Sequence, residues 1–218
     1  MDIKVNKDTV IAFDLDDTLY NEIEYLKSAY RAIADDLDPA NNKFLYRNMF
    51  ALYRKGENVF QYLAENYNVE VKDLIDLYRN HNPKIHLFNN VLEVLETIKL
   101  KGGKLAIVTD GRVKTQMAKI EALGIKELFG KIVISEAIGT EKPNQLNFEA
   151  IENALPASTY YYVGDNITKD FVSPNKMGWK TIGLIDNGLN IHCEVNENVQ
   201  EEYLPHCLIN SYQEINIL

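Results

Sequence analysis

Apolar and polar positions follow two different patterns along the chain. Residues 9–13 form a short apolar run, Thr-Val-Ile-Ala-Phe, that stops at a cluster of acidic residues, as expected of a buried strand. Segments with apolar residues at helical spacing separate four later runs of this kind, and alternating strands and helices are typical of a parallel sheet. The later runs predict strands over residues 104–109, 131–135, 159–163 and 180–185. The pattern therefore predicts an α/β fold, with a Rossmann-like parallel sheet and helices on both of its faces.

Residues 21–86 differ from the rest because their apolar positions recur only at helical spacing. Ile23, Leu26, Tyr30 and Ile33 mark the first of about four predicted helices. Since this block stands between the first strand and the rest of the sheet, we expect an inserted all-helical cap domain. The predicted domains are a catalytic core over residues 1–20 and 87–218 and a helical cap over residues 21–86.

The composition narrows the range of partners. The 218 residues are 46% apolar and 25% charged, which is ordinary for a globular protein. No apolar run approaches the ~20 residues of a membrane helix, and charges interleave at the N-terminus where a secretory signal would be apolar. We therefore expect a cytoplasmic protein with no membrane partner.

The formal net charge of −9 disfavours nucleic acid as a partner, because binding nucleic acid depends on lysine and arginine. The two cysteines imply no disulfide framework, and the oligomeric state stays open.

A reactive polar group follows each of the first four predicted strands. In an open parallel sheet, ligands bind beyond the carboxyl ends of the strands, and these ends lie along one edge. We therefore expect the polar groups to converge in one pocket. They are Asp14 and Asp16 after the first strand, Thr109 at the end of the second, Lys142 after the third, and Asp165 and Asp170 after the fourth.

This set of side chains suits a metal ion and an anion. Carboxylates that meet in one pocket repel each other, and one becomes protonated unless a cation is shared. Mg2+ fits such a pocket, because it binds a few carboxylates and keeps waters or phosphate oxygens as further ligands. Thr109 and Lys142 would then clamp a second anionic group. The pocket is predicted to hold Mg2+ and a group of phosphate size.

The same strand-end segments match, in order, the signatures of a known family. They are Asp14-Leu-Asp16-Asp-Thr18, Thr109, Lys142-Pro143 and Gly164-Asp165-Asn-x-x-x-Asp170. With these motifs and the helical block after the first of them, residues 9 to about 185 resemble the haloacid dehalogenase superfamily, in the subfamily with a helical cap. Asp16 favours the branch of the family that transfers phosphoryl groups, because dehalogenase members generally lack an aspartate two residues after the nucleophile.

The resemblance implies a role for each matching residue. Asp14 would be the nucleophile that forms an aspartyl phosphate, and Asp16 would protonate the leaving group and then activate water. Mg2+ would be held by the Asp14 side chain, the Asp16 backbone carbonyl and Asp165. The other site residues would be Asn166 and Asp170 behind the metal, and Thr109, Asp110, Gly111 and Lys142 around the phosphoryl group. For Gly111, a turn before the next helix is an equally good interpretation.

These observations favour a Mg2+-dependent phosphatase that acts on a small phosphomonoester, such as a sugar phosphate or a nucleotide. The same chemistry would serve a phosphosugar mutase, which passes the phosphoryl group to a second hydroxyl instead of to water. From a different class, a receiver-like signalling module also uses strand-end Asp, Thr and Lys, but such a module needs no cap and no acid like Asp16. The small phosphorylated metabolite itself is not identified by the sequence.

Two local features stay open at this point. Lys43, Arg47 and Arg54 share one face of the second cap helix, which predicts either a solvated face or a contact with a second anionic part of the substrate. Ser173-Pro174 stand where members of the family commonly have Gly-Ala, which leaves the start of the following helix uncertain.

Two His-Cys pairs, His192-Cys193 and His206-Cys207, raise the question of a zinc site. The paired short spacing of structural zinc sites is missing, and adjacent residues point in different directions in regular structure. We therefore expect no zinc site at these residues.

Overall fold

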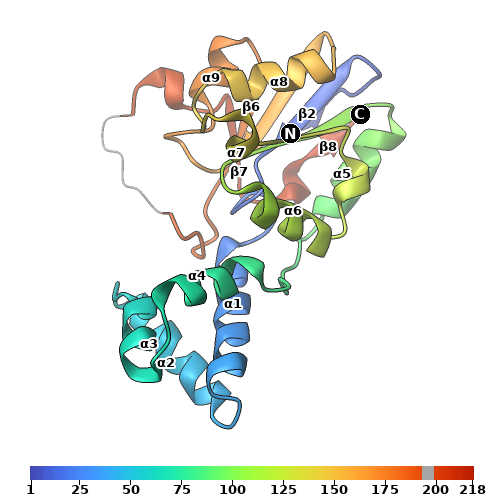
Figure 1. Cartoon of the computed structure of the whole chain (residues 1–218). Coiled ribbons are helices and arrows are strands. Elements are labelled where there is room, and N and C mark those ends of the chain that lie inside the picture. The colour runs from blue at the N-terminus through green and yellow to red at the C-terminus, as the bar shows by residue number, and fades with distance from the viewer. Residues whose placement is uncertain (193–198) are drawn as a thin grey trace. The chain divides into compact units, whose positions relative to one another are not determined.

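The computed structural model describes residues 1–192 and 199–218, which form two compact units. We call them the core unit, Met1–Glu22 with His86–Leu218, and the helical unit, Ile23–Ile85 (Figure 1). Within the described residues, no helix has both the length and the apolar character needed to cross a membrane.

The core unit contains a six-stranded sheet in which all neighbouring strands are parallel. Its strand order is β4-β3-β2-β5-β6-β7. The strands are β2 (Thr9–Phe13), β3 (Lys104–Thr109), β4 (Lys131–Ile134), β5 (Thr159–Gly164), β6 (Lys180–Leu184) and β7 (Cys207–Ile209). The predicted parallel sheet is confirmed. The third predicted strand is one residue shorter than expected, because Ser135 already begins a helix.

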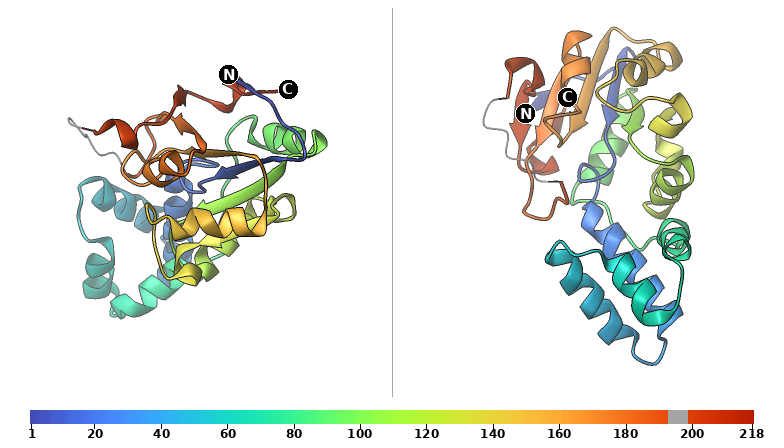
Figure 2. Two further views of the ribbon diagram at one scale, coloured as in Figure 1. Left: turned by 90° about the horizontal axis from the view of Figure 1, so that it is seen from above. Right: turned by 60° about the vertical axis from the view of Figure 1, so that its left-hand side comes forward.

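Helices cover both faces of this sheet, as predicted. The top view in Figure 2 shows α5 and α8 on opposite faces. Phe148 and Ile151 of α8 pack in one buried cluster with Val10, Tyr162 and Trp179. The helices of the core unit are α5 (Val91–Leu100), α6 (Val113–Ala122), α7 (Ser135–Ile138), α8 (Leu146–Ala154) and α9 (Val172–Lys176), with short 3-10 turns η1 (Lys126–Leu128), η2 (Glu201–Tyr203) and η3 (Tyr212–Glu214).

The register of the sheet places the functional segments at one edge. All five residues of β2 are buried, as expected of a central strand covered on both faces. Phe13, the last of them, pairs with Ile107 on one side and with Val163 on the other. The chain therefore leaves β2 and β5 at the same level, and Asp14 and Asp165 emerge side by side.

The C-terminal segment, which carries little periodicity, completes the core unit. Strand β8 (Asn216–Ile217) pairs with β1 (Asp2–Ile3), so the two chain ends meet (Figure 1). Tyr212 is buried and donates its hydroxyl to the carbonyl of Thr18 at 3.0 Å. The segment thus supports the loop that follows β2.

The helical unit consists of α1, which begins in the core unit, and three further helices. One fully buried residue from each helix, Ile33, Met49, Leu63 and Leu74, marks its apolar core. These helices are α1 (Glu22–Leu37), α2 (Asn42–Arg54), α3 (Val59–Tyr67) and α4 (Val71–Asn80), in agreement with the four helices expected.

In this unit the basic side chains of α2 are exposed, whereas aromatic side chains pack against each other. Lys43, Arg47 and Arg54 are exposed, on the face of α2 opposite to its buried residues. Tyr25 and Tyr78 meet edge to face with ring centroids 5.4 Å apart, which is a packing arrangement.

Candidate active site

A cavity lies at the carboxyl edge of the sheet, within the core unit. Most of the site residues predicted from the sequence line it, together with four that were not predicted. The lining residues are Asp14, Asp16, Asp17, Glu22, Thr109, Asp110, Lys142, Asp165, Asn166, Lys169 and His192. Parallel α/β sheets bind ligands in this position.

Asp14 lines the cavity and pairs with Lys142. Lys142 Nζ lies 2.7 Å from Asp14 Oδ1, and both side chains are nearly inaccessible. Burial raises the pKa of Asp14 to about 7, since the neighbouring charge of Asp170 adds to the effect and Lys142 only partly offsets it. A carboxylate in this state is a nucleophile that benefits from a further cation.

Lys142 is held from three directions. Its Nζ also contacts Asp170 Oδ1 at 2.7 Å and the hydroxyl of Tyr162 at 3.2 Å. Burial opposes its charge, but Asp14 and Asp170 outweigh this effect and raise the pKa of Lys142 well above its ordinary value. The backbone N–H of Lys142 donates to Asp110 Oδ1 at 2.9 Å, which fixes the loop that carries it. The ammonium group is therefore charged and immobile.

Asp170 lies behind the cavity and is completely buried. Its Oδ2 accepts the backbone N–H groups of Asp165 at 3.1 Å and Asn166 at 2.8 Å, while its Oδ1 accepts from Lys142. A Cβ on Gly164 would come within 2.5 Å of Asp170 Oδ2, so this position requires glycine. Asp170 thus links the loop after β5 to the lysine.

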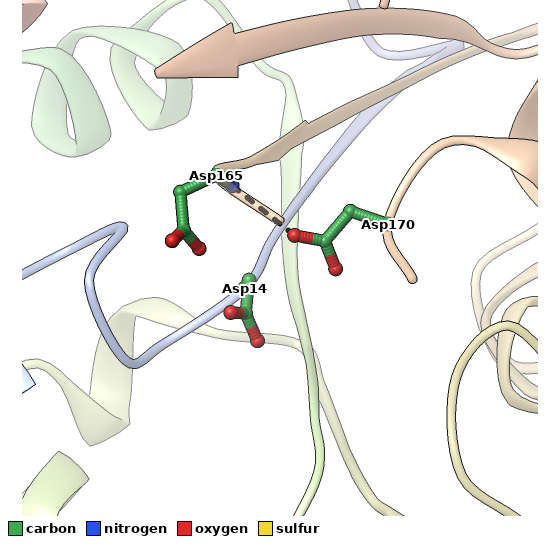
Figure 3. A group of neighbouring side chains, drawn as sticks. All are labelled: Asp14, Asp165 and Asp170. Carbon is green, nitrogen blue, oxygen red and sulfur yellow. Dashed lines mark hydrogen bonds between the residues drawn. The ribbon is translucent and has the colours of Figure 1, made fainter. Parts of the chain in front are cut away.

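Three carboxylates form a group that is able to hold a metal ion. One oxygen from each of Asp14, Asp165 and Asp170 lies within 4.8 Å of the others (Figure 3). Burial and the charges of Asp170 and Asp14 raise the pKa of Asp165 to about 9. Hard oxygen donors that repel each other in this way fit a divalent cation such as Mg2+.

Two donors fix the orientation of Asp165. Thr18 Oγ1 donates to Asp165 Oδ1 at 3.2 Å, and Asn190 Nδ2 donates to Asp165 Oδ2 at 2.9 Å. The oxygens of Asp170 already accept four hydrogen bonds, from Lys142, Tyr162 and two backbone amides. Asp14 and Asp165 are therefore the better ligands, with Asp170 behind them.

Asp16 points to a different set of partners. Lys119 Nζ contacts both of its carboxylate oxygens, at 2.7 and 2.8 Å, Gln116 Nε2 donates to Oδ2 at 2.8 Å, and Tyr20 donates its hydroxyl to Oδ1. Burial alone would raise the pKa of Asp16, but Lys119 and the hydrogen bonds lower it below its ordinary value. The carboxyl is not free in the cavity; it is held by three donors.

Two predicted phosphate-binding residues, Asp110 and Gly111, follow β3. The N–H of Gly111 donates to Ser135 Oγ at 2.9 Å, and Gly111 does not line the cavity. Its φ of 133° requires glycine, which favours the interpretation of this residue as a turn. The carboxylate of Asp110 accepts from the Lys142 backbone and lies 3.5 Å from Lys169, so its side chain anchors the loop, and a phosphate contact by this residue stays a prediction.

The Ser173-Pro174 segment turns out to be compatible with the site. Helix α9 begins at Val172, so Pro174 lies in its first turn, where proline is tolerated. The hydroxyl of Ser173 donates to the carbonyl of Pro143, next to Lys142. The departure from the family pattern therefore adds a support for the lysine loop.

The described residues give no support to a zinc site. His192 is largely exposed, and Cys193 lies outside the described residues. His206 Nδ1 contacts Oγ1 of Thr181 at 2.7 Å, and Cys207 Sγ contacts the sulfur of Met1. Neither residue belongs to a group of three or more His, Cys, Asp or Glu ligands in the part of the chain that the structure describes.

Sequence reasoning missed Gln116 and Lys119, whose burial is unusual for their type. Val113, Met117 and Ile120 recur at helical spacing and predict an apolar face for this helix, but Val113 is 37% exposed. The signal available in the sequence was the spacing of Gln116, Lys119 and Ile120, which fall on one helix face. It is weak, because a lysine in such a position usually faces solvent.

A Rossmann-like sheet with aspartates and a lysine gathered at its carboxyl edge defines a haloacid dehalogenase-like core. The family model described as "haloacid dehalogenase-like hydrolase" matches residues 11–184, and the chain belongs to this family.

Two curated relatives and one solved structure illustrate the similarity. The glyceraldehyde 3-phosphate phosphatase of Methanocaldococcus jannaschii is 27% identical over 94% of both chains. The pyrophosphatase PpaX of Halalkalibacterium halodurans is 29% identical over 78% of this chain and 80% of that one. In the fold, the chain is similar to the HAD hydrolase YfnB of Bacillus subtilis bound to magnesium, with a TM-score of 0.65, 20% identity and coverage of 96% and 97%.

Proposed function

We propose that this protein is a Mg2+-dependent phosphatase that hydrolyses a small phosphomonoester, such as a sugar phosphate or a nucleotide, through an aspartyl phosphate. The observation that carries the proposal is the meeting of Asp14, Asp165 and Lys142 at one edge of the sheet, with Asp16 beside them in the same cavity. The curated relatives act on phosphorylated compounds according to their names, which supports the same chemistry.

In the first step, a carboxylate oxygen of Asp14 attacks phosphorus, and the bond from phosphorus to the leaving oxygen breaks. Asp16 is ionised in the structure because Lys119 lowers its pKa, so it takes up a proton as the substrate binds and then gives this proton to that oxygen, and the leaving group departs as an alcohol. In the second step, Asp16 takes a proton from a water molecule, which attacks phosphorus. The acyl phosphate bond breaks, phosphate leaves, and the Asp14 carboxylate and protonated Asp16 are restored.

The other residues hold the phosphoryl group and neutralise its charge. Lys142 presents a charged ammonium group between Asp14 and Asp170, and the hydroxyl of Thr109 can donate to a phosphoryl oxygen. Mg2+, held by the Asp14 side chain, the Asp16 carbonyl and Asp165, would stabilise negative charge on the transferred oxygens. Phosphoryl transfer needs this positioning and charge neutralisation more than it needs a large cofactor.

We also propose that residues 21–86 act as a cap that excludes bulk water from the reaction and helps to select the leaving group. The exposed basic residues Lys43, Arg47 and Arg54 are candidates for contact with a second anionic part of the substrate.

A screen of phosphorylated metabolites tests the proposal, with inorganic phosphate release as the readout and chelator as the control. Hydrolysis of one or more small phosphomonoesters with Mg2+, and none with chelator, is expected. Transfer of the group to a second hydroxyl when a bisphosphate primer is added would identify a mutase. An aspartyl phosphate that persists well beyond seconds would instead identify a receiver-like module.

A further inference from the structure

Helix α6 turns a buried lysine and a buried glutamine towards Asp16. Lys119 contacts both oxygens of Asp16 at 2.7 and 2.8 Å, and its side chain is only 4% exposed. Gln116 lies three residues earlier, on the same helix face. Neither residue lines the cavity, but both contact Asp16, which does.

Stability alone does not explain the lysine. Transfer of an ammonium group from water to a protein interior is unfavourable, and a buried ion pair is often no more stable than a well-packed apolar pair. An apolar side chain at position 119 could pack into the core, as that of the neighbouring Ile120 does. Its charge instead serves Asp16 at contact distance and Glu22 at 3.8 Å, both of which line the cavity.

Gln116 connects two predicted site residues. Its Nε2 donates to Asp16 Oδ2 at 2.8 Å and to Thr109 Oγ1 at 2.7 Å. A carboxylate only accepts hydrogen bonds, so the amide nitrogen, with its two hydrogens, must face this way. Because the hydroxyl oxygen of Thr109 accepts from Gln116, its own hydrogen points elsewhere, and its acceptor in the structure is the carbonyl of Asp110 at the long distance of 3.5 Å, which a phosphoryl oxygen can replace.

We propose that Lys119 and Gln116 are positioning residues for acid–base catalysis: they hold the Asp16 carboxyl in one orientation beside Asp14. Gln116 also directs the Thr109 hydroxyl hydrogen to the phosphoryl group. This inference rests on the proposed function, because it gives the two residues a role through the acid–base group of that reaction. Proton transfer requires the acid to lie within hydrogen-bond reach of the leaving oxygen. Loss of the orientation should therefore lower kcat, while binding of the phosphoryl group by Lys142 should persist.

The test is a comparison of Lys119→Met in the wild-type and in the Asp16→Asn background, with phenyl phosphate as the substrate. In the wild-type background kcat should fall about 10-fold or more, within the ~100 to 10,000-fold that general acid–base catalysis contributes. KM should change less than about threefold, since the effect lies in the proton-transfer step. In the Asp16→Asn background the same substitution should slow the reaction less than about twofold, because residues that act through one group are not additive.

Two further variants serve as controls. Lys114→Met, which removes an exposed lysine of the same helix, should leave kcat unchanged. Lys119→Arg should restore most of kcat, because a guanidinium group also offers two donors to a carboxylate. The double variant removes both charges of the Lys119–Asp16 pair, so it should fold even where Lys119→Met alone is destabilised, and circular dichroism checks this.

A fall by the same factor in both backgrounds, or an effect on KM alone, would overturn the positioning role while the phosphatase proposal stands. If the wild-type protein hydrolyses no phosphomonoester, the proposed function fails first, and the inference fails with it.

Discussion

Two sides of the cavity each pair an aspartate with a buried lysine at 2.7 Å, yet their carboxyl groups behave differently. On the nucleophile side, burial and the charge of Asp170 raise the pKa of Asp14 to about 7 in spite of Lys142. On the acid–base side, Lys119 and two further donors lower the pKa of Asp16. One ion pair therefore does not determine the state of a carboxyl group; the surrounding charges and hydrogen bonds do. The carboxylates on the nucleophile side, Asp14 and Asp165, need a further cation to stay ionised. On the acid–base side, donors from the protein itself stabilise the ionised carboxyl of Asp16.

The largest expected effect comes from removing the nucleophile. Asp14→Asn keeps the shape of the side chain but not its nucleophilic oxygen, so turnover should fall by orders of magnitude with the fold intact. Steady-state assays, with circular dichroism to check folding, measure this. Retention of more than about a tenth of the activity would contradict a covalent mechanism at Asp14.

Removal of each lysine should lower the unfolding free energy by a different amount on the two sides of the cavity. Lys142→Met leaves Asp14 and Asp170 without their cation in a buried place, which should cost about 3–5 kcal/mol of unfolding free energy. Lys119→Met should cost less, because the other two donors to Asp16 remain. Urea unfolding of the metal-free variants measures both values. An equal or larger loss for Lys119→Met would contradict this ordering of the two lysines.

Metal and pH should act together on the nucleophile side. In the absence of metal, the folded-state pKa values of Asp14, about 7, and Asp165, about 9, lie above the ordinary 3.8. The folded protein then binds more protons than the unfolded chain between about pH 4 and pH 9, so its stability should fall as pH rises through this range. Mg2+ replaces these protons, and its stabilising effect should grow with pH.

Thermal melts at several pH values, with and without Mg2+, check this expectation. Asp165→Asn is the matched control, since it removes a titrating carboxyl and should flatten the pH dependence of the metal-free protein. A Tm of the metal-free protein that rises from pH 5 to pH 9 would contradict the assignment.

The smallest effect, on Mg2+ affinity, is expected from removing a side chain that orients Asp165. Asn190→Ala removes one of the two donors that orient Asp165, while Thr18 remains. Loss of a group that orients a metal ligand typically weakens metal binding ~10 to 100-fold, and the lower value is expected here because one donor is kept. Calorimetric titration with Mg2+ measures the change. Unaltered affinity would show that Thr18 alone fixes Asp165.

The nucleophile side was predictable from the sequence because its residues follow strand ends. Asp14, Lys142, Asp165 and Asp170 stand in loops whose positions are determined by a parallel sheet, and parallel strands place their carboxyl ends on one edge. The parallel sheet itself was predicted from short apolar runs, including the fully buried β2. Both predictions depend on topology more than on side-chain detail.

The acid–base side was predictable only in part, since Lys119 lies within a helix. A helix pattern does not distinguish a lysine that faces solvent from one that faces a buried carboxylate, because both occupy polar positions. The same limit applies to Asn190, which comes from a segment with little periodicity, and to β7, whose three residues are too few for an alternating pattern. The hydrogen bond from Gly111 to Ser135 was not predictable either, because Ser135 follows a different strand, β4.

The most direct test of the account is a single-turnover experiment with Asp16→Ala and p-nitrophenyl phosphate, followed by mass spectrometry of the peptide that contains Asp14. This aryl ester has a good leaving group, so the first step should proceed without the acid, while the loss of water activation should trap a phosphoryl group on Asp14. Mg2+ affinity should be largely unchanged, and an alkyl phosphate should be slowed much more than the aryl ester. Equal slowing of both esters with a large drop in Mg2+ affinity, or no phosphoryl group on Asp14, would contradict the account.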